Sequence, residues 1–115
     1  MRAVPLGFDP SSLTAIANDF KYEIIFSRQL QALGKPGDTL WAFSTSGNSP
    51  NILAAMETAK AMEITTVLFS NHDGGSARLM ADYFLYTPQS STPRVQELRL
   101  LYAHILCEMI ELRCA

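Results

Sequence analysis

Charge of either sign is scarce in this chain of 115 residues. Charged residues make up 17% of it, with 9 lysines and arginines against 11 aspartates and glutamates. Such a balance provides no basic face for a nucleic-acid backbone, so we expect no direct binding of DNA or RNA. Long apolar runs are missing too, because Pro5, Gly7 and Asp9 interrupt the first apolar residues. The sequence therefore predicts no signal peptide, no membrane partner and a cytoplasmic location.

Cysteine is also rare, with two in the chain. Cys107 and Cys114 fall on one predicted helix at a separation of about 10 Å along its axis, which is too far for a disulfide. We expect buried or free thiols. Apolar residues, at 48% of the chain, are sufficient for one core, so residues 1–115 should form a single domain.

What the sequence does contain is an alternation of short apolar runs with longer segments of helical period. This pattern is typical of βαβ units and predicts an α/β fold with a parallel sheet. We expect strands at residues 3–8, 39–43, 65–69 and 83–86. One helix is expected to run to about residue 20, with Ser11 or Ser12 as its cap. Further helices are expected over 22–33, from Ser49 or Pro50 to about 62, over 77–80, and from Pro93 onward. The last helix repeats apolar side chains at three- and four-residue steps, so we expect much of it to be buried.

Hydroxyl side chains gather in the 44–49 loop, whose sequence is STSGNS and which directly follows a predicted strand. Ligands of parallel sheets bind at this edge, and the next helix would turn its free N–H groups and positive dipole end toward an anion. The loop contains no lysine or arginine, which favours a small phosphate monoester over a nucleoside triphosphate. The alternative is an ordinary polar turn capped by Ser49.

Five stretches together resemble one protein family in their order and approximate spacing. They are AIAND at 15–19, FSRQ at 26–29, STSGNS at 44–49, NHDGG at 71–75 and RVQE at 94–97. The family is that of the sugar isomerase (SIS) domains, and the greatest similarity is to the phosphoheptose isomerases. The resemblance implies a three-layer, flavodoxin-like sheet with helices on both faces. It also implies a homotetramer that converts sedoheptulose 7-phosphate to heptose 7-phosphate, an aldose–ketose isomerisation through an enediol in lipopolysaccharide heptose synthesis.

The resemblance also assigns roles to single residues. By it, Ser44, Ser46 and Ser49 hold the phosphate, while Thr45 contacts the sugar and Asp19 also binds the substrate. These assignments make a phosphorylated sugar the expected partner.

By the same resemblance, Gln96 and His104 are the catalytic pair on the last helix and also ligate a divalent metal. Zinc is the expected metal, and two protein ligands would hold it weakly. Helix geometry places the two side chains about 80° apart around the axis and about 12 Å apart along it, so both can face one pocket. The simpler alternatives are a buried histidine bonded to a backbone carbonyl and a polar residue near the start of the helix.

Several parts of the family pattern have no counterpart in this sequence. The relatives carry an N-terminal helix, a first strand, a Gly-Ser phosphate loop, and a helix bearing a metal-binding histidine and the glutamate base. We therefore expect an N-terminally truncated SIS domain with impaired isomerase activity. The alternative is a non-catalytic regulatory or interaction module like the replication-initiator-associating SIS protein. His104 favours the enzyme, since that regulator lacks the histidine, and the missing base favours the module. Pro93 stands where some relatives have an aspartate, which puts one substrate contact in doubt.

Overall fold

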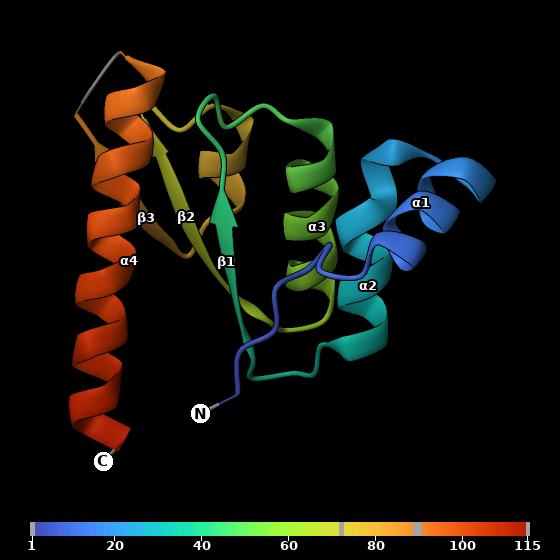
Figure 1. Ribbon diagram of the computed structural model, residues 1–115, viewed down its shortest axis with the longest axis horizontal. Coiled ribbons are helices and arrows are strands. Elements are labelled where there is room, and N and C mark those ends of the chain that lie inside the picture. The colour runs from blue at the N-terminus through green and yellow to red at the C-terminus, as the bar shows by residue number, and fades with distance from the viewer. Residues whose placement is uncertain (1, 72, 89–90, 115) are drawn as a thin grey trace.

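A parallel sheet forms the centre of the molecule. The computed structural model describes residues 2–71, 73–88 and 91–114. Within these residues, β1 (Thr39–Phe43), β2 (Thr65–Asn71) and β3 (Tyr83–Thr87) lie in the order β1-β2-β3 (Figure 1). In the register, Phe43 lies opposite Phe69. The predicted strands at 39–43, 65–69 and 83–86 are thereby confirmed, and β2 and β3 each extend past their predicted ends.

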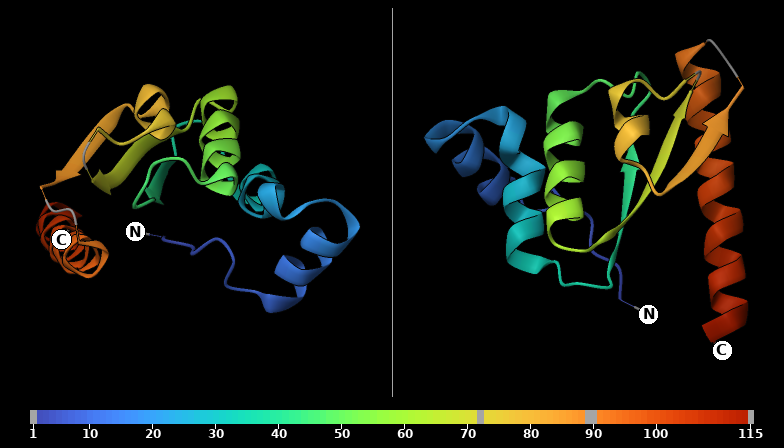
Figure 2. Two further views of the ribbon diagram at one scale, coloured as in Figure 1. Left: turned by 90° about the horizontal axis from the view of Figure 1, so that it is seen from above. Right: turned by 180° about the vertical axis from the view of Figure 1, so that it is seen from behind.

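Helices cover both faces of the sheet (Figure 2). α3 (Pro50–Ala61) and the short 3-10 helix η2 (Ser76–Met80) lie on one face, and α4 (Thr92–Cys114) contacts β2 and β3 from the other. The core on the α3 side consists of four buried side chains: Ala42, Met56, Leu68 and Ala77. This arrangement confirms the predicted three-layer α/β fold.

The N-terminal helices lie beside α3 and away from the sheet. α2 (Ile25–Leu33) continues from the 3-10 turn η1 (Tyr22–Ile24) and packs along α3, with α1 (Pro10–Asp19) beyond it (Figure 1). The contact between α2 and α3 has a small buried core: Leu30, Ala59 and Ile64. Residues 22–33 are therefore helical as predicted, although their first turn is tighter than an α-helix.

The cap of α1 differs from the prediction. The carboxylate of Asp9 accepts hydrogen bonds from the N–H groups of Ser11 (3.1 Å) and Ser12 (3.0 Å), and Pro10 takes the first helical position. The hydroxyl and N–H of Ser12, and then the N–H of Ser11, hold the pKa of Asp9 below its usual value. The expected cap at Ser11 or Ser12 was wrong, because a carboxylate before proline satisfies both free N–H groups at once.

Residues 3–8 do not form the predicted strand. They run as an irregular segment with a turn at Leu6 and Gly7, and Gly7 takes a φ of +87°. The N–H of Gly7 donates to Oε1 of Gln29 at 2.9 Å, which ties the segment to α2 and not to a strand. Apolar content predicted a strand here, but a strand also needs a neighbouring edge, and Pro5 offers no N–H to one.

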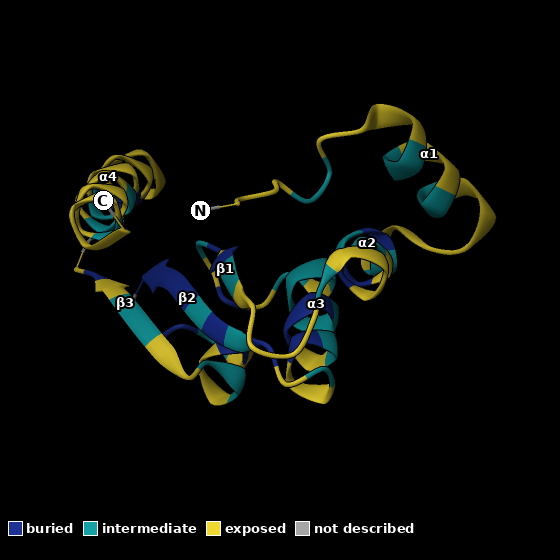
Figure 3. Cartoon of the chain, turned by 90° about the horizontal axis from the view of Figure 1, so that it is seen from below, coloured by how far each residue is buried: buried dark blue, intermediate teal, exposed yellow. Residues whose placement is uncertain are grey.

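Most of α4 is not buried, contrary to our expectation. Val95 and Arg99 are its only buried residues in the described chain, and most of its outer surface is exposed (Figure 3). An exposed apolar stripe runs along the helix: Leu101, Ile105, Met109 and Leu112. The three- and four-residue spacing included Ile105, Met109 and Leu112 in the face expected to be buried, but spacing does not show which side of a helix meets the sheet. Among the described helices, none combines the length and apolar character that a membrane span needs.

The two cysteines lie on α4 as predicted. Cys107 and Cys114 are both exposed free thiols.

Candidate functional site

The 44–49 loop leaves the carboxyl end of β1 and is fixed by its own hydroxyl groups. Ser44 is buried, and its N–H donates to the carbonyl of Phe69 on β2 at 3.1 Å. Its Oγ accepts the N–H of Gly47 at 3.0 Å, and Oγ of Ser46 accepts the N–H of Asn48 at 3.2 Å. The loop therefore folds back on itself, with a left-handed Gly47 (φ +67°) at its bend.

A second loop, at residues 73–76, locks the first one in place. Ala77 donates its N–H to the carbonyl of Gly47 at 2.9 Å, and Ser76 donates its N–H to Oδ1 of Asn48 at 2.9 Å. A Cβ atom added to Gly47 would lie 1.8 Å from the carbonyl oxygen of Gly74, so only glycine permits this approach. Two of the family-like stretches are thus parts of one structure, which their separation in the sequence did not reveal. His72, within the second stretch, lies outside the described residues.

The start of α3 faces the same site. Ser49 occupies the position before the helix and Pro50 the first helical position, as predicted. The carbonyl of Ser49 accepts the N–H groups of Ile52 and Leu53, both at 3.0 Å, whereas its side chain makes no capping bond. In the alternative, an ordinary polar turn capped by Ser49, the cap position is as expected, but the Ser49 hydroxyl contributes no capping hydrogen bond. Ser49 lines the pocket described below, at the positive end of the α3 dipole, where an anion would be favoured.

An open pocket of about 930 Å³ lies between these loops and α4. Its wall is mostly polar on the loop side and partly apolar on the helix side. The lining residues are Phe43, Ser44, Thr45, Ser46, Ser49, Asn71, Asp73, Thr92, Gln96, Arg99, Leu100 and Ala103. The pocket thus lies beyond the carboxyl ends of parallel strands, where open α/β sheets bind their ligands.

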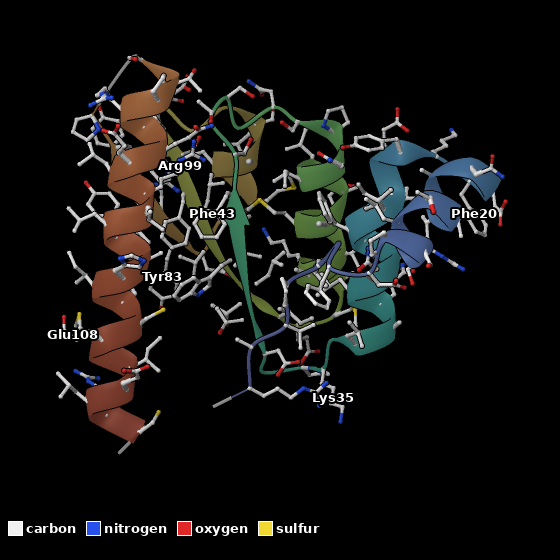
Figure 4. The ribbon with its side chains drawn as sticks, in the orientation of Figure 1. Phe20, Lys35, Phe43, Tyr83, Arg99 and Glu108 are labelled. Carbon is white, nitrogen blue, oxygen red and sulfur yellow. The ribbon has the colours of Figure 1, made fainter. Side chains whose placement is uncertain are left out.

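One cation reaches this pocket from α4. Arg99 is buried, and its Nη2 donates to Oγ1 of Thr45 while its Nε donates to the carbonyl of Val95 at 3.4 Å (Figure 4). Burial lowers the pKa of the Arg99 guanidinium, which nonetheless stays charged because arginine ionises far above neutral pH. Sequence reasoning did not include this cation, because Arg99 is 54 residues from Thr45 in the chain.

The predicted site residues separate into two groups. Ser44, Thr45, Ser46 and Ser49 line the pocket, and so does Gln96 from α4: the structure brings these residues together. Asn71 and Asp73 join them, although the resemblance assigned no role to either residue.

Asp19 and His104 do not line the pocket. Asp19 is the last residue of α1, and its Oδ1 accepts the side-chain amide of Asn18 at 2.9 Å. The helix α1 lies beside α2, on the far side of α3 from α4 (Figure 1). His104 is exposed on α4, so the alternative of a buried histidine is wrong. In the described part of the chain, no three His, Cys, Asp or Glu side chains are grouped to hold a metal ion. The proposed roles of Asp19 and His104 stay predictions.

The fold and pocket together define a class of protein. It is the class of open parallel α/β domains whose ligand pocket is built from a hydroxyl-rich loop at a helix N-terminus. The sequence profile of the SIS domain matches residues 4–71. The chain belongs to the SIS domain family.

Comparison with known proteins places the chain within this family. It is 48% identical over 111 residues to a phosphoheptose isomerase of Helicobacter pylori, covering 96% of this chain and 58% of that protein. It is 51% identical over 109 residues to a phosphoheptose isomerase of Burkholderia pseudomallei, covering 95% of this chain and 55% of that one. The solved phosphoheptose isomerase of Neisseria gonorrhoeae superposes with a TM-score of 0.91 at 40% identity, over 94% of this chain and 61% of its own. The chain therefore spans a little over half the length of these relatives.

Proposed function

We propose that this chain binds a phosphorylated sugar, a heptose 7-phosphate or sedoheptulose 7-phosphate, with its phosphate on the 44–49 loop. The observation that carries the proposal is the convergence of the loop hydroxyls, the start of α3 and Arg99 on one pocket. Neutral donors and a helix N-terminus suit a phosphate monoester. The kinship to proteins named phosphoheptose isomerase supports a heptose as the sugar.

The reaction proposed is isomerisation between aldose and ketose through an enediol, in the synthesis of surface heptose in the cytoplasm. A base must take the proton from the carbon beside the carbonyl and return it to the neighbouring carbon, while an acid serves the oxygens. Asp73 is the only carboxylate among the described lining residues, and its Oδ1 accepts the N–H of Gly75 at 3.0 Å. The glutamate base implied by the resemblance has no counterpart in these 115 residues. We propose that phosphate binding resides in these 115 residues and that Asp73 alone does not supply the proton transfer needed for efficient turnover.

A non-catalytic binding or interaction module is the second candidate. The observation that favours it is the same lack of a second carboxylate in the described wall of the pocket. Both candidates require a functional phosphate loop, and only the first requires turnover.

Replacing Ser46 and Ser49 together with alanine should weaken binding of sedoheptulose 7-phosphate by roughly 2 to 4 kcal/mol. Each hydroxyl is expected to donate to the phosphate. A hydrogen bond to a charged group contributes about 1.5 to 3 kcal/mol, and two bonds to the same phosphate are not independent, so their joint loss is less than the sum. Calorimetric titration measures the change. Ser76→Ala is the matched control, because Ser76 binds Asn48 through its backbone N–H and lies outside the pocket wall. Equal affinity of the unaltered chain and the double variant would remove the phosphate-loop assignment.

We propose that zinc binding by this chain alone is weak. Gln96 and His104 are the implied ligands, but Gln96 lines the pocket and His104 does not, and a catalytic zinc has three protein ligands.

We expect the chain to lose zinc on dialysis, and His104→Ala to abolish any affinity that remains. Mass spectrometry measures the zinc that remains after dialysis, and competition with a chelating indicator dye measures the zinc affinity. Cys107→Ser is the control, since an exposed thiol can take up zinc on its own. Tight, stoichiometric zinc that survives His104→Ala would locate the metal site elsewhere.

We also propose that the chain forms a homo-oligomer. The support is the exposed apolar stripe on α4 and the second edge of β1, which pairs with no strand among the described residues. Unpaired strand edges and apolar stripes are commonly covered by another copy of the same chain. Light scattering of the purified chain tests this, and a monodisperse monomer at high concentration would contradict it.

A further inference from the structure

Arg99 is a buried cation with no acidic partner in the described chain. Only 6% of the accessible surface of Arg99 is exposed to solvent. The one ion pair among the described residues joins Arg94 and Glu97, on the exposed side of the same helix. Burying an uncompensated charge is costly, and such charges are normally paired. A buried arginine in the wall of an open pocket therefore calls for an anion from outside the chain.

The hydrogen bonds of Arg99 leave donors free. A guanidinium carries five N–H groups, of which the chain uses one at Nε, toward Val95, and one at Nη2, toward Thr45. The bond to the Val95 carbonyl is long, at 3.4 Å. Because Arg99 lines the pocket, its remaining N–H groups are available to a ligand there.

The bond to Thr45 also sets the direction of the Thr45 hydroxyl. Arginine can only donate, so Oγ1 of Thr45 is the acceptor and its own hydrogen must point away from Arg99. Thr45 lines the pocket next to Ser44 and Ser46. Its hydroxyl is thus prepared as a donor toward the ligand and is polarised by the adjacent charge.

We propose that Arg99 is the phosphate-binding cation of the pocket and selects a dianionic phosphate monoester, both directly and by orienting the hydroxyl of Thr45. The proposal rests on the proposed function, since it concerns the same ligand and the same loop. It differs in assigning the electrostatic part of recognition to α4, whereas the 44–49 loop supplies neutral donors. Direct contact would let the ligand compensate the buried charge that the chain leaves unpaired.

The test is calorimetric titration of the full chain with sedoheptulose 7-phosphate and with inorganic phosphate at several salt concentrations. Arg99→Gln should bind both about 10- to 100-fold more weakly, as expected for the loss of a charge-assisted hydrogen bond. Its affinity should also depend less on salt, because one charge has been removed from the site. A purely structural role would not change the salt dependence. Arg99→Lys, which keeps the charge, should stay within about tenfold of the unaltered chain.

Arg94→Gln is the matched control, because it removes the same charge from the same helix outside the pocket wall. It should bind as the unaltered chain does. Thermal unfolding of every variant shows that it is folded, and the lysine variant keeps the test valid if Arg99→Gln does not fold.

Two results would overturn the inference while leaving the phosphate loop intact. One is equal affinity and equal salt dependence of Arg99→Gln and the unaltered chain, with binding still lost in the Ser46 and Ser49 double variant. The other is a folded Arg99→Lys variant as weak as Arg99→Gln. Absence of binding of either probe by the unaltered chain would overturn both the inference and the proposed function.

Discussion

Gly47→Ala should reduce the affinity for sedoheptulose 7-phosphate by roughly 100-fold or more, because a displacement of about an ångström in a binding site can cost that much. The new Cβ would lie 1.8 Å from the carbonyl oxygen and 2.3 Å from the carbonyl carbon of Gly74, which are backbone atoms and cannot rotate aside. The 44–49 and 73–76 loops must then separate. The free energy of unfolding should also fall by roughly 2 to 5 kcal/mol, because the two loops lose their contact and because alanine at position 47 must adopt a left-handed φ.

Gly37→Ala provides the matched control for this change. Gly37 also has a left-handed backbone, with φ of +89°, but nothing lies within 4 Å of its Cβ position. It precedes β1 at the end of the strand opposite the pocket. The control should lose about 1 to 2 kcal/mol of stability from the backbone conformation alone and keep its affinity. Denaturant unfolding and calorimetry measure both quantities, and full affinity in Gly47→Ala would contradict the description of the interlocked loops.

The unaltered chain alone should isomerise sedoheptulose 7-phosphate at a rate about 10²- to 10⁴-fold below that of an intact relative. This is the range that positioned proton transfer contributes, and the described pocket offers one carboxylate, Asp73, already bonded to Gly75. A coupled assay of aldose formation measures the rate. Adding the part of the Helicobacter pylori relative that lies outside the matched region should restore part of the turnover.

The second edge of β1 and the apolar stripe of α4 give this mixing experiment a structural readout. Light scattering should show self-association of the chain alone and a defined complex in the mixture. The same mixture made with the Gly47→Ala variant is the control, since it should not bind substrate. A monodisperse monomer that reaches the relative's full rate on its own would show that our account of the missing base is wrong.

Much of the fold was predictable because its signals are local. The runs that became β1 and β2 are apolar and bounded by turn residues, and Pro50 begins α3 just as its missing N–H allows. The predictions that failed, the strand at 3–8 and the burial of α4, depend on contacts between distant segments of the chain. A strand at 3–8 needs an edge to pair with, and the burial of α4 depends on which surfaces meet it, so neither follows from the residues themselves.

The part of the candidate site that is continuous in sequence, the 44–49 loop, was predictable. The hydroxyls at 44–49 and the adjacent helix start were visible as one motif. Arg99 was not, because an arginine on an amphipathic helix usually reaches solvent, and only the packing of α4 on the sheet buries it beside Thr45. Asn48 gave no signal of its role either, since its partners Ser46 and Ser76 lie on two separate loops.

The most direct test of the phosphate-loop assignment is a titration of isotope-labelled chain with sedoheptulose 7-phosphate, followed by the backbone amide signals in NMR. We predict saturable shifts centred on Ser46, Gly47, Ser49 and Ala77, with the Nε–H signal of Arg99 moving in parallel. Shifts centred instead on the second hollow between α1 and α2, which Ser12, Ile16 and Arg28 help to line, would contradict the assignment, as would no shift at all.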